Sequence, residues 1–189
     1  MKRIYIITLL AMLAMVSQAQ IARSSLYGTT KKNQPTSSRL WLELGAGSFT
    51  GDLEKPGVAL DLGLRYTHMF HENVGWDVIK LSAQTDTKEF SDMLNVQLKS
   101  GIRTVTPVLF GNSSLYANFS AGYGYYTYIE KGGFVWEVGA GINITPNISV
   151  GVNYNDANLK VDDYFDIGDY SYYDKVKIGI VSLRVAYGF

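Results

Sequence analysis

Residues that could carry out catalysis are few in this chain. The sequence has no Cys and only two His, His68 and His71, so a disulfide framework and a Cys-based metal site are excluded. An enzyme needs a nucleophile with a base, or a set of metal ligands. A Ser–His–Asp arrangement would need a His at the rim where such a site opens, but both His fall beside one predicted tight turn at the other end. We therefore predict no catalytic residue, no metal site and no cofactor.

Nine charged residues form the main candidate site. In segments of alternating polarity they share the parity of Gly and other small residues, not that of bulky apolar residues. If these positions face the inside of a barrel, the charges could form a gated pore or a proton path. Alternatively, they could form a plug of ion pairs, which is favoured because side chains usually fill small barrels. The predicted lumen ion network comprises Glu43, Asp61, Arg65, Asp77, Lys99, Arg103, Glu137, Lys177 and Arg184.

A second cluster lies in a long predicted loop, residues 156–174, which is acidic and aromatic. Tyr offers a large contact area at low entropic cost, which suits recognition of an extracellular protein or glycan. Carboxylates could also hold Ca²⁺, but the spacing of an EF-hand is missing. The alternative is that these residues only extend the barrel wall and keep its rim wet. The binding candidates are Asp162, Asp163, Tyr164, Phe165, Asp166, Asp169, Tyr170, Tyr172 and Tyr173.

Alternation with a period of two predicts the strands that position these residues. Residues 115–129 alternate almost without a break, whereas strands of soluble proteins usually have about five or six residues. Fifteen residues tilted by about 40° rise roughly 38 Å, enough to cross a lipid band about 25 Å thick. Short and longer connections between the predicted strands also alternate, which is typical of an up-and-down barrel. We predict an all-β fold, an eight-stranded antiparallel up-and-down transmembrane β-barrel with strands at 39–49, 57–70, 74–83, 93–105, 115–129, 133–145, 148–155 and 175–189.

Side-chain size predicts which face of the strands is inside. The interior of an eight-stranded barrel is narrow, so it should carry the smaller residues. Gly63, Gly101, Gly122 and Gly139 share parity with the polar residues of their strands, and bulky apolar residues take the opposite parity. Aromatic residues of that outer parity gather near strand ends, as in the interfacial girdles of membrane barrels.

Two strands change parity along their length. In the third strand the outward series passes from Val78 to Ile79, which leaves the direction of Lys80 undetermined. In the last strand, Val176, Ile178 and Ile180 are followed by apolar residues of the other parity. We expect a β-bulge in each strand, because one extra residue restores the register.

The N-terminal region predicts export. Lys2 and Arg3 precede an apolar run and a small-x-small cleavage site, so residues 1–19 are predicted to be a secretory signal peptide. Residues 20–38 are polar and lack periodicity, which predicts a flexible periplasmic tail before a barrel at 39–189. The formal net charge of zero gives no reason to expect a nucleic-acid partner.

The C-terminal sequence "SLRVAYGF" resembles the targeting signal of Gram-negative outer-membrane barrels, with Tyr187 and Phe189 as its aromatic residues. From about residue 39 the chain resembles the small outer-membrane protein β-barrel family, of the OmpA and OmpX transmembrane type. The segment "LELGAGSFTGDL" also resembles the first strand and loop of such barrels. The resemblance implies location in the outer membrane of a Gram-negative cell envelope, contact with its lipid, and the barrel assembly machinery as a partner during biogenesis.

The resemblance implies no common reaction. We therefore expect a non-enzymatic envelope component, acting as a surface scaffold or adhesin through its extracellular loops. The alternative is a narrow, porin-like diffusion channel for small solutes or ions.

Overall fold

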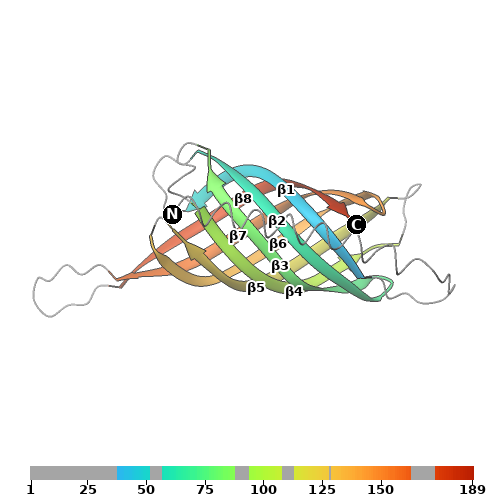
Figure 1. Cartoon of the computed structure of the whole chain (residues 1–189), viewed down its shortest axis with the longest axis horizontal. Coiled ribbons are helices and arrows are strands. Elements are labelled where there is room, and N and C mark those ends of the chain that lie inside the picture. Colours follow the sequence, from blue (N-terminus) through green and yellow to red (C-terminus); the bar gives the residue numbers. More distant parts are fainter. Residues whose placement is uncertain (1–37, 52–56, 88–93, 108–112, 128, 163–172) are drawn as a thin grey trace, which may run out of the picture.

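The computed structural model describes residues 38–51, 57–87, 94–107, 113–127, 129–162 and 173–189. In these residues eight antiparallel strands form a closed barrel, in which each strand pairs with the next and the first pairs with the last (Figure 1). None of the described residues forms a helix long and apolar enough to cross a membrane. The strands are β1 (Ser38–Gly51), β2 (Val58–His71), β3 (Val74–Asp86), β4 (Leu94–Val105), β5 (Ser114–Tyr126), β6 (Lys131–Thr145), β7 (Ile148–Asp162) and β8 (Tyr173–Gly188).

The two ends of the barrel differ in their connections. Two-residue turns join β2 to β3 and β6 to β7, and β8 ends beside them. We call this the short-turn end and the opposite one the long-loop end. At the long-loop end, β7 and β8 reach beyond the other strands (Figure 1) and remain paired as far as Asp162 and Tyr173. The predicted loop 156–174 was therefore too long, because both of its flanks belong to strands.

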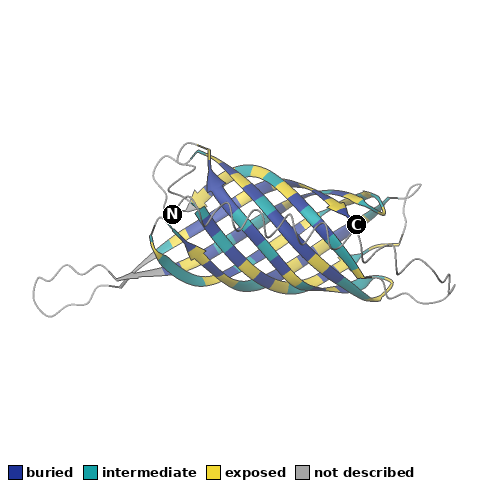
Figure 2. Ribbon diagram, viewed as in Figure 1, coloured by how far each residue is buried: buried dark blue, intermediate teal, exposed yellow. Residues whose placement is uncertain are grey.

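The outer face of the barrel is apolar and the inner face is largely polar. Burial alternates along each strand, which gives the chequered pattern of Figure 2. Outward residues such as Leu98 and Leu183 are more than half exposed, whereas inward residues such as Gln97 and Ser182 are buried. A soluble protein shows the reverse arrangement, so this pattern is typical of a membrane barrel.

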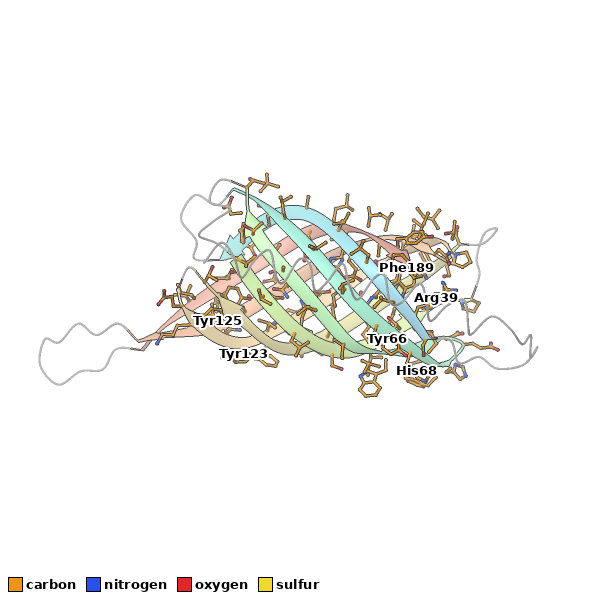
Figure 3. All side chains as sticks on the ribbon, in the orientation of Figure 1. Arg39, Tyr66, His68, Tyr123, Tyr125 and Phe189 are labelled. Atoms are coloured by element: carbon orange, nitrogen blue, oxygen red, sulfur yellow. The ribbon has the colours of Figure 1, made fainter. Side chains whose placement is uncertain are left out.

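Aromatic residues on the outer face mark two levels. Tyr66 and Phe189 lie toward the short-turn end, and Tyr123 and Tyr125 lie toward the long-loop end (Figure 3). The Tyr187 and Phe189 rings meet edge to face, with centroids 5.1 Å apart. Outward aromatic residues toward both ends match the interfacial girdles that flank a lipid-facing band.

The expected bulge in β3 is confirmed. Asp77 pairs with Gly101 of β4 and Lys80 pairs with Lys99, so two residues of β3 oppose a single residue of β4. Val78 and Ile79 occupy this bulge, and the change of register turns Lys80 into the lumen, where it is buried.

The expected bulge in β8 is wrong. The described pairs of β8 with β1 and with β7 run without a register shift. The change of parity has another cause: Ile178 and Ile180 face inward and are buried, while Val181 and Leu183 continue the outward series. The strand is regular, and the lumen it lines becomes apolar toward the long-loop end.

Candidate functional site

Glu137 of β6 is the centre of a charged cluster inside the barrel. Its side chain is 0% exposed. Lys99 Nζ donates to its Oε2 over 2.7 Å, and Arg184 Nη1 donates to its Oε1 over 2.9 Å. Lys80 Nζ also donates to Oε1. Cations from β4, β8 and β3 therefore converge on one carboxylate.

Glu43 of β1 is a second anionic centre. It forms ion pairs with Arg65 Nε at 3.0 Å, Lys80 Nζ at 3.1 Å and Arg184 Nη1 at 3.2 Å. Lys80 and Arg184 thus connect Glu43 to the carboxylate of β6 across the lumen. Arg184 Nη2 also donates to Asp61 of β2. A single network ties six of the eight strands together through the interior.

The network compensates charge well but leaves some polar atoms without a bond. Burial of an ion costs several kcal/mol, and a partner of opposite charge offsets this cost only with good geometry and further hydrogen bonds. Asp61 Oδ1 and Arg65 Nη2 are buried without a hydrogen-bond partner among the protein atoms. The members of the cluster therefore depend on one another, because removal of one charge leaves its partners buried without a compensating charge.

A layer of amide side chains lies next to the charges. Lys99 Nζ donates to Gln97 Oε1 over 2.8 Å. The Gln97 amide also bonds to Gln84, Tyr126 and Asn155, at 2.8 to 3.1 Å. These residues come from β3, β4, β5 and β7, so hydrogen bonds cross the lumen at this level too.

An apolar cluster fills the lumen toward the long-loop end. Its members are buried and come from six strands, so they close over the amide layer. Ile180 and Leu159 are at most 1% exposed. The cluster consists of Phe49, Ala59, Tyr126, Val135, Ala157, Leu159, Ile178 and Ile180.

The family profile described as "Outer membrane protein beta-barrel domain" matches residues 6–189. The chain belongs to this outer-membrane β-barrel family. Family membership and the closed barrel with an apolar outer face place the protein in the outer membrane of a Gram-negative envelope. No curated protein matches the sequence.

Several solved barrel structures are similar to this one. Neisserial surface protein A has 11% identity to this chain and a TM-score of 0.55, with 82% of this chain and 99% of that chain covered. Ail of Yersinia pestis, solved with the heparin analogue sucrose octasulfate, has 18% identity and a TM-score of 0.44, covering 82% and 99%. A de novo designed transmembrane β-barrel has 14% identity and a TM-score of 0.42, covering 80% and 95%.

Eight of the nine residues predicted for the lumen ion network are buried inside this outer-membrane barrel. Lys177 is the exception, and its prediction was wrong. It is exposed on the outer face of β8, because the strand is regular and the neighbouring Ile178 points inward. Lys80, whose direction the sequence left undetermined, also belongs to the network and bonds to both glutamates. Lys99, the cross-strand neighbour of Lys80 in β4, has lumen parity. The register could therefore have shown that Lys80 faces the lumen, once the bulge was placed.

Arg103 and Asp77 lie inside the barrel but outside the central cluster. Asp77 accepts a hydrogen bond from Thr67 Oγ1 over 2.6 Å and lies 3.7 Å from Arg65 Nη1. Arg103 forms no salt bridge with any described residue; its Nη2 donates to Asn143 Oδ1 over 3.0 Å. The predicted network therefore has a compact centre and a separate cationic residue nearer the short-turn end.

The His residues lie at the short-turn end, as the turn prediction required. Ser38 Oγ and His68 Nδ1 are 2.8 Å apart at the exposed start of β1 (His68 is labelled in Figure 3). Among the described residues no carboxylate bonds to this His, so the pair lacks the third member of a catalytic triad.

Seven of the nine candidate binding residues of the long loop lie outside the described residues. Asp162 ends β7 and Tyr173 begins β8, where they form the last pair of the ladder.

At the short-turn end, the Phe189 amide donates to the Leu40 carbonyl over 2.9 Å. This bond continues the seam between β8 and β1 by one residue.

Proposed function

We propose that this protein is a non-enzymatic, non-conducting barrel that acts as a surface scaffold or adhesin. The observation that carries the proposal is the bonding of Glu137 to Lys80, Lys99 and Arg184 across the lumen. Because such bonds fill the barrel interior, the ends of the molecule are the surfaces available for contact with partners. Outer-membrane lipid would contact its apolar outer face, and the barrel assembly machinery would read Tyr187 and Phe189.

The narrow diffusion channel is the less well supported alternative. A hydrated ion would have to break the bridges to Glu137, then the bonds of Gln97, and finally pass the apolar cluster. Each step exposes a buried charge or amide, or moves an ion into apolar surroundings, and both are costly. Three successive obstacles of different chemistry favour a plug.

The hairpin of β7 and β8 is the proposed contact surface for a protein or glycan. In outer-membrane barrels the short turns face the periplasm and the longer loops face the outside. The paired strands extend farthest at the long-loop end (Figure 1), as far as Asp162 and Tyr173, and the sequence between these two residues is acidic and aromatic. A hairpin that stands out beyond the other strands is accessible to a protein or glycan, which suits an adhesin.

Conductance in planar bilayers tests the plug. The purified barrel should show no steady openings. A variant with Glu137→Gly and Arg184→Gly should conduct better if it folds, because these substitutions remove two side chains that bridge the lumen. Steady, ion-selective openings of the unmodified protein would support the channel instead.

Loop replacement tests the contact surface. Replacement of residues 163–172 by a short Gly/Ser turn keeps the Asp162–Tyr173 pair and should leave the barrel folded. Binding of displayed protein to glycan and protein arrays should disappear. A matched replacement of residues 52–56, which join β1 to β2 at the same end, should preserve it. Binding that survives the first replacement would exclude the hairpin as the contact surface.

A further inference from the structure

A cavity opens into the barrel at the short-turn end. Its volume is about 230 Å³, and residues of β1, β2, β4, β5 and β6 line it. Two of them are arginines, Arg39 and Arg103, and the described lining residues include no Asp or Glu. The wall also includes Ser114 and Asn143, which are hydrogen-bonded to each other, whereas the Thr67 hydroxyl already donates to Asp77. The two arginines therefore give the cavity its positive charge and hydrogen-bond donors.

Arg103 is the unusual member of this wall. It is only 3% exposed, yet it forms no salt bridge with a described residue. Its guanidinium carbon lies 3.7 Å from the centre of the Tyr116 ring and 5.6 Å from that of the Trp41 ring. Such cation–π contacts stabilise the charge only in part, so a buried guanidinium still favours an anionic partner. Arg103 uses one of its five N–H groups on Asn143 Oδ1.

The position of Arg103 is fixed by the packing behind it. Gly141 of β6 and Gly151 of β7 are directly paired. A Cβ at Gly151 would lie 2.2 Å from Tyr116 Oη, and one at Gly141 would lie 2.8 Å from it. The two glycines thus make room for the Tyr116 ring, which in turn supports Arg103. The guanidinium is held by a rigid surface, as a binding site requires.

Arg39 lies at the opening of this cavity. It lies at the start of β1 toward the short-turn end (Figure 3), and its Nη1 donates to the Pro146 carbonyl. Its guanidinium carbon is 6.0 Å from the centre of the Trp41 ring, so Trp41 lies near both arginines. Met69 and Val105 add apolar surface to the same wall.

We propose that this cavity binds a small organic anion, with its carboxylate or phosphate group on Arg103 and Arg39 and its apolar body on Trp41 and Met69. Arginine matches the oxygens of both kinds of anion with paired N–H donors. The volume admits a group of several non-hydrogen atoms but excludes a folded partner. The site lies on the side opposite the proposed adhesive hairpin, so it is independent of that function.

A single-tryptophan protein provides the test. The chain has three Trp, and Trp76 and Trp136 are on the outer face. With Trp76→Phe and Trp136→Phe, the fluorescence of the folded full chain in detergent reports on Trp41 alone. Butyl phosphate, butyrate and butanol share an apolar body but differ in charge. At constant ionic strength we expect a saturable change with at least one of the two anions and none with butanol. The stronger of the two anions identifies a phosphate or a carboxylate site.

Variants decide whether the arginines cause the response. Arg103→Met should weaken anion binding more than tenfold, because a charge-assisted bond is lost. Arg39→Met, at the half-buried rim, should weaken it at least threefold and serves as the decisive variant if Arg103→Met does not fold. Lys177→Met removes a cation from the outer face near the other end and should change nothing. The proposal is overturned if neither anion gives a saturable change, if butanol gives the same change, or if the folded arginine variants bind as the parent does.

Discussion

At the scale of single residues, the lumen shows how strongly each charge depends on its neighbours. Glu137 is 0% exposed and has three cationic partners. Buried ion pairs often contribute little net stability compared with apolar packing, but loss of one partner is severe because the remaining charges stay buried. Lys80, Lys99 and Arg184 would all be affected by one substitution.

Glu137→Gln is therefore expected to lower the free energy of unfolding by about 3–5 kcal/mol, because it removes the charge and keeps the shape. Urea unfolding of the barrel in lipid vesicles measures this difference. Glu130→Gln is the matched control, since Glu130 lies in the exposed turn before β6. Equal stability of the two variants would show that the network does not hold the barrel together.

Phe189 is the second residue with a measurable individual role. Its amide extends the seam between β8 and β1, and its ring packs on Tyr187. Phe189→Asp should reduce the folded fraction in outer membranes, seen as loss of the heat-modifiable band in SDS gels. Phe189→Tyr keeps the aromatic ring and should retain folding. An undiminished folded band in the Asp variant would mean that assembly does not use the terminal aromatic residue.

At the scale of elements, the sequence predicted the fold far better than the details of the site. Period-two alternation depends only on which face meets lipid, so all eight strands could be found, and the outward faces too except at the β3 bulge and in the first part of β8. The bulge in β3 could be expected but not placed, because Val78 and Ile79 are both apolar and either could face outward. Lys80 was undetermined for that reason.

Strand β8 illustrates the opposite difficulty. Its inward residues change from Arg184 and Ser182 to Ile180 and Ile178, so the rule that the inner face is polar fails halfway along the strand. A sequence pattern cannot distinguish an apolar lumen from a change of register. The error moved Lys177 into the lumen, although it lies on the outer face.

The apolar cluster makes a prediction for this part of the barrel. Ile180 is 1% exposed inside the cluster, whereas Ile102 of β4 is 56% exposed on the outer face. Ile180→Ala should cost about 2–5 kcal/mol, because fixed neighbours cannot fill the cavity. Ile102→Ala should cost less, since mobile lipid chains can close around the smaller side chain. Unfolding in lipid vesicles compares the two, and an equal loss would contradict the dry, packed lumen.

At the scale of the whole molecule, the lumen is layered along the barrel axis. A donor-rich cavity lies at the short-turn end, charged residues and amides lie in the middle, and apolar residues lie at the long-loop end. The outer face has its own layers, with aromatic residues toward both ends. A molecule with such polarity has a fixed orientation in an asymmetric membrane.

The N-terminal segment yields one further prediction. Residues 1–19 should be removed during export, because the sequence before Ala19 has the charge, apolar run and small residues of a signal peptide. Mass spectrometry of protein purified from outer membranes should find Gln20 as the N-terminus. Retention of Met1 in the membrane-inserted protein would refute this assignment.

The place of Arg184 in the chain has a consequence for the order of events during biogenesis. Arg184 lies on β8, which follows the other seven strands in the chain and closes the barrel against β1. Until β8 arrives, Asp61 lacks a salt-bridge partner among the described residues, and Glu43 and Glu137 each lack one of their cations. Seam closure and charge neutralisation therefore coincide. Before the seam closes, the lumen is open to water and these carboxylates stay hydrated. Closure removes that water and supplies Arg184 in the same step, so a barrel without Arg184 would have to bury Asp61 without this cation.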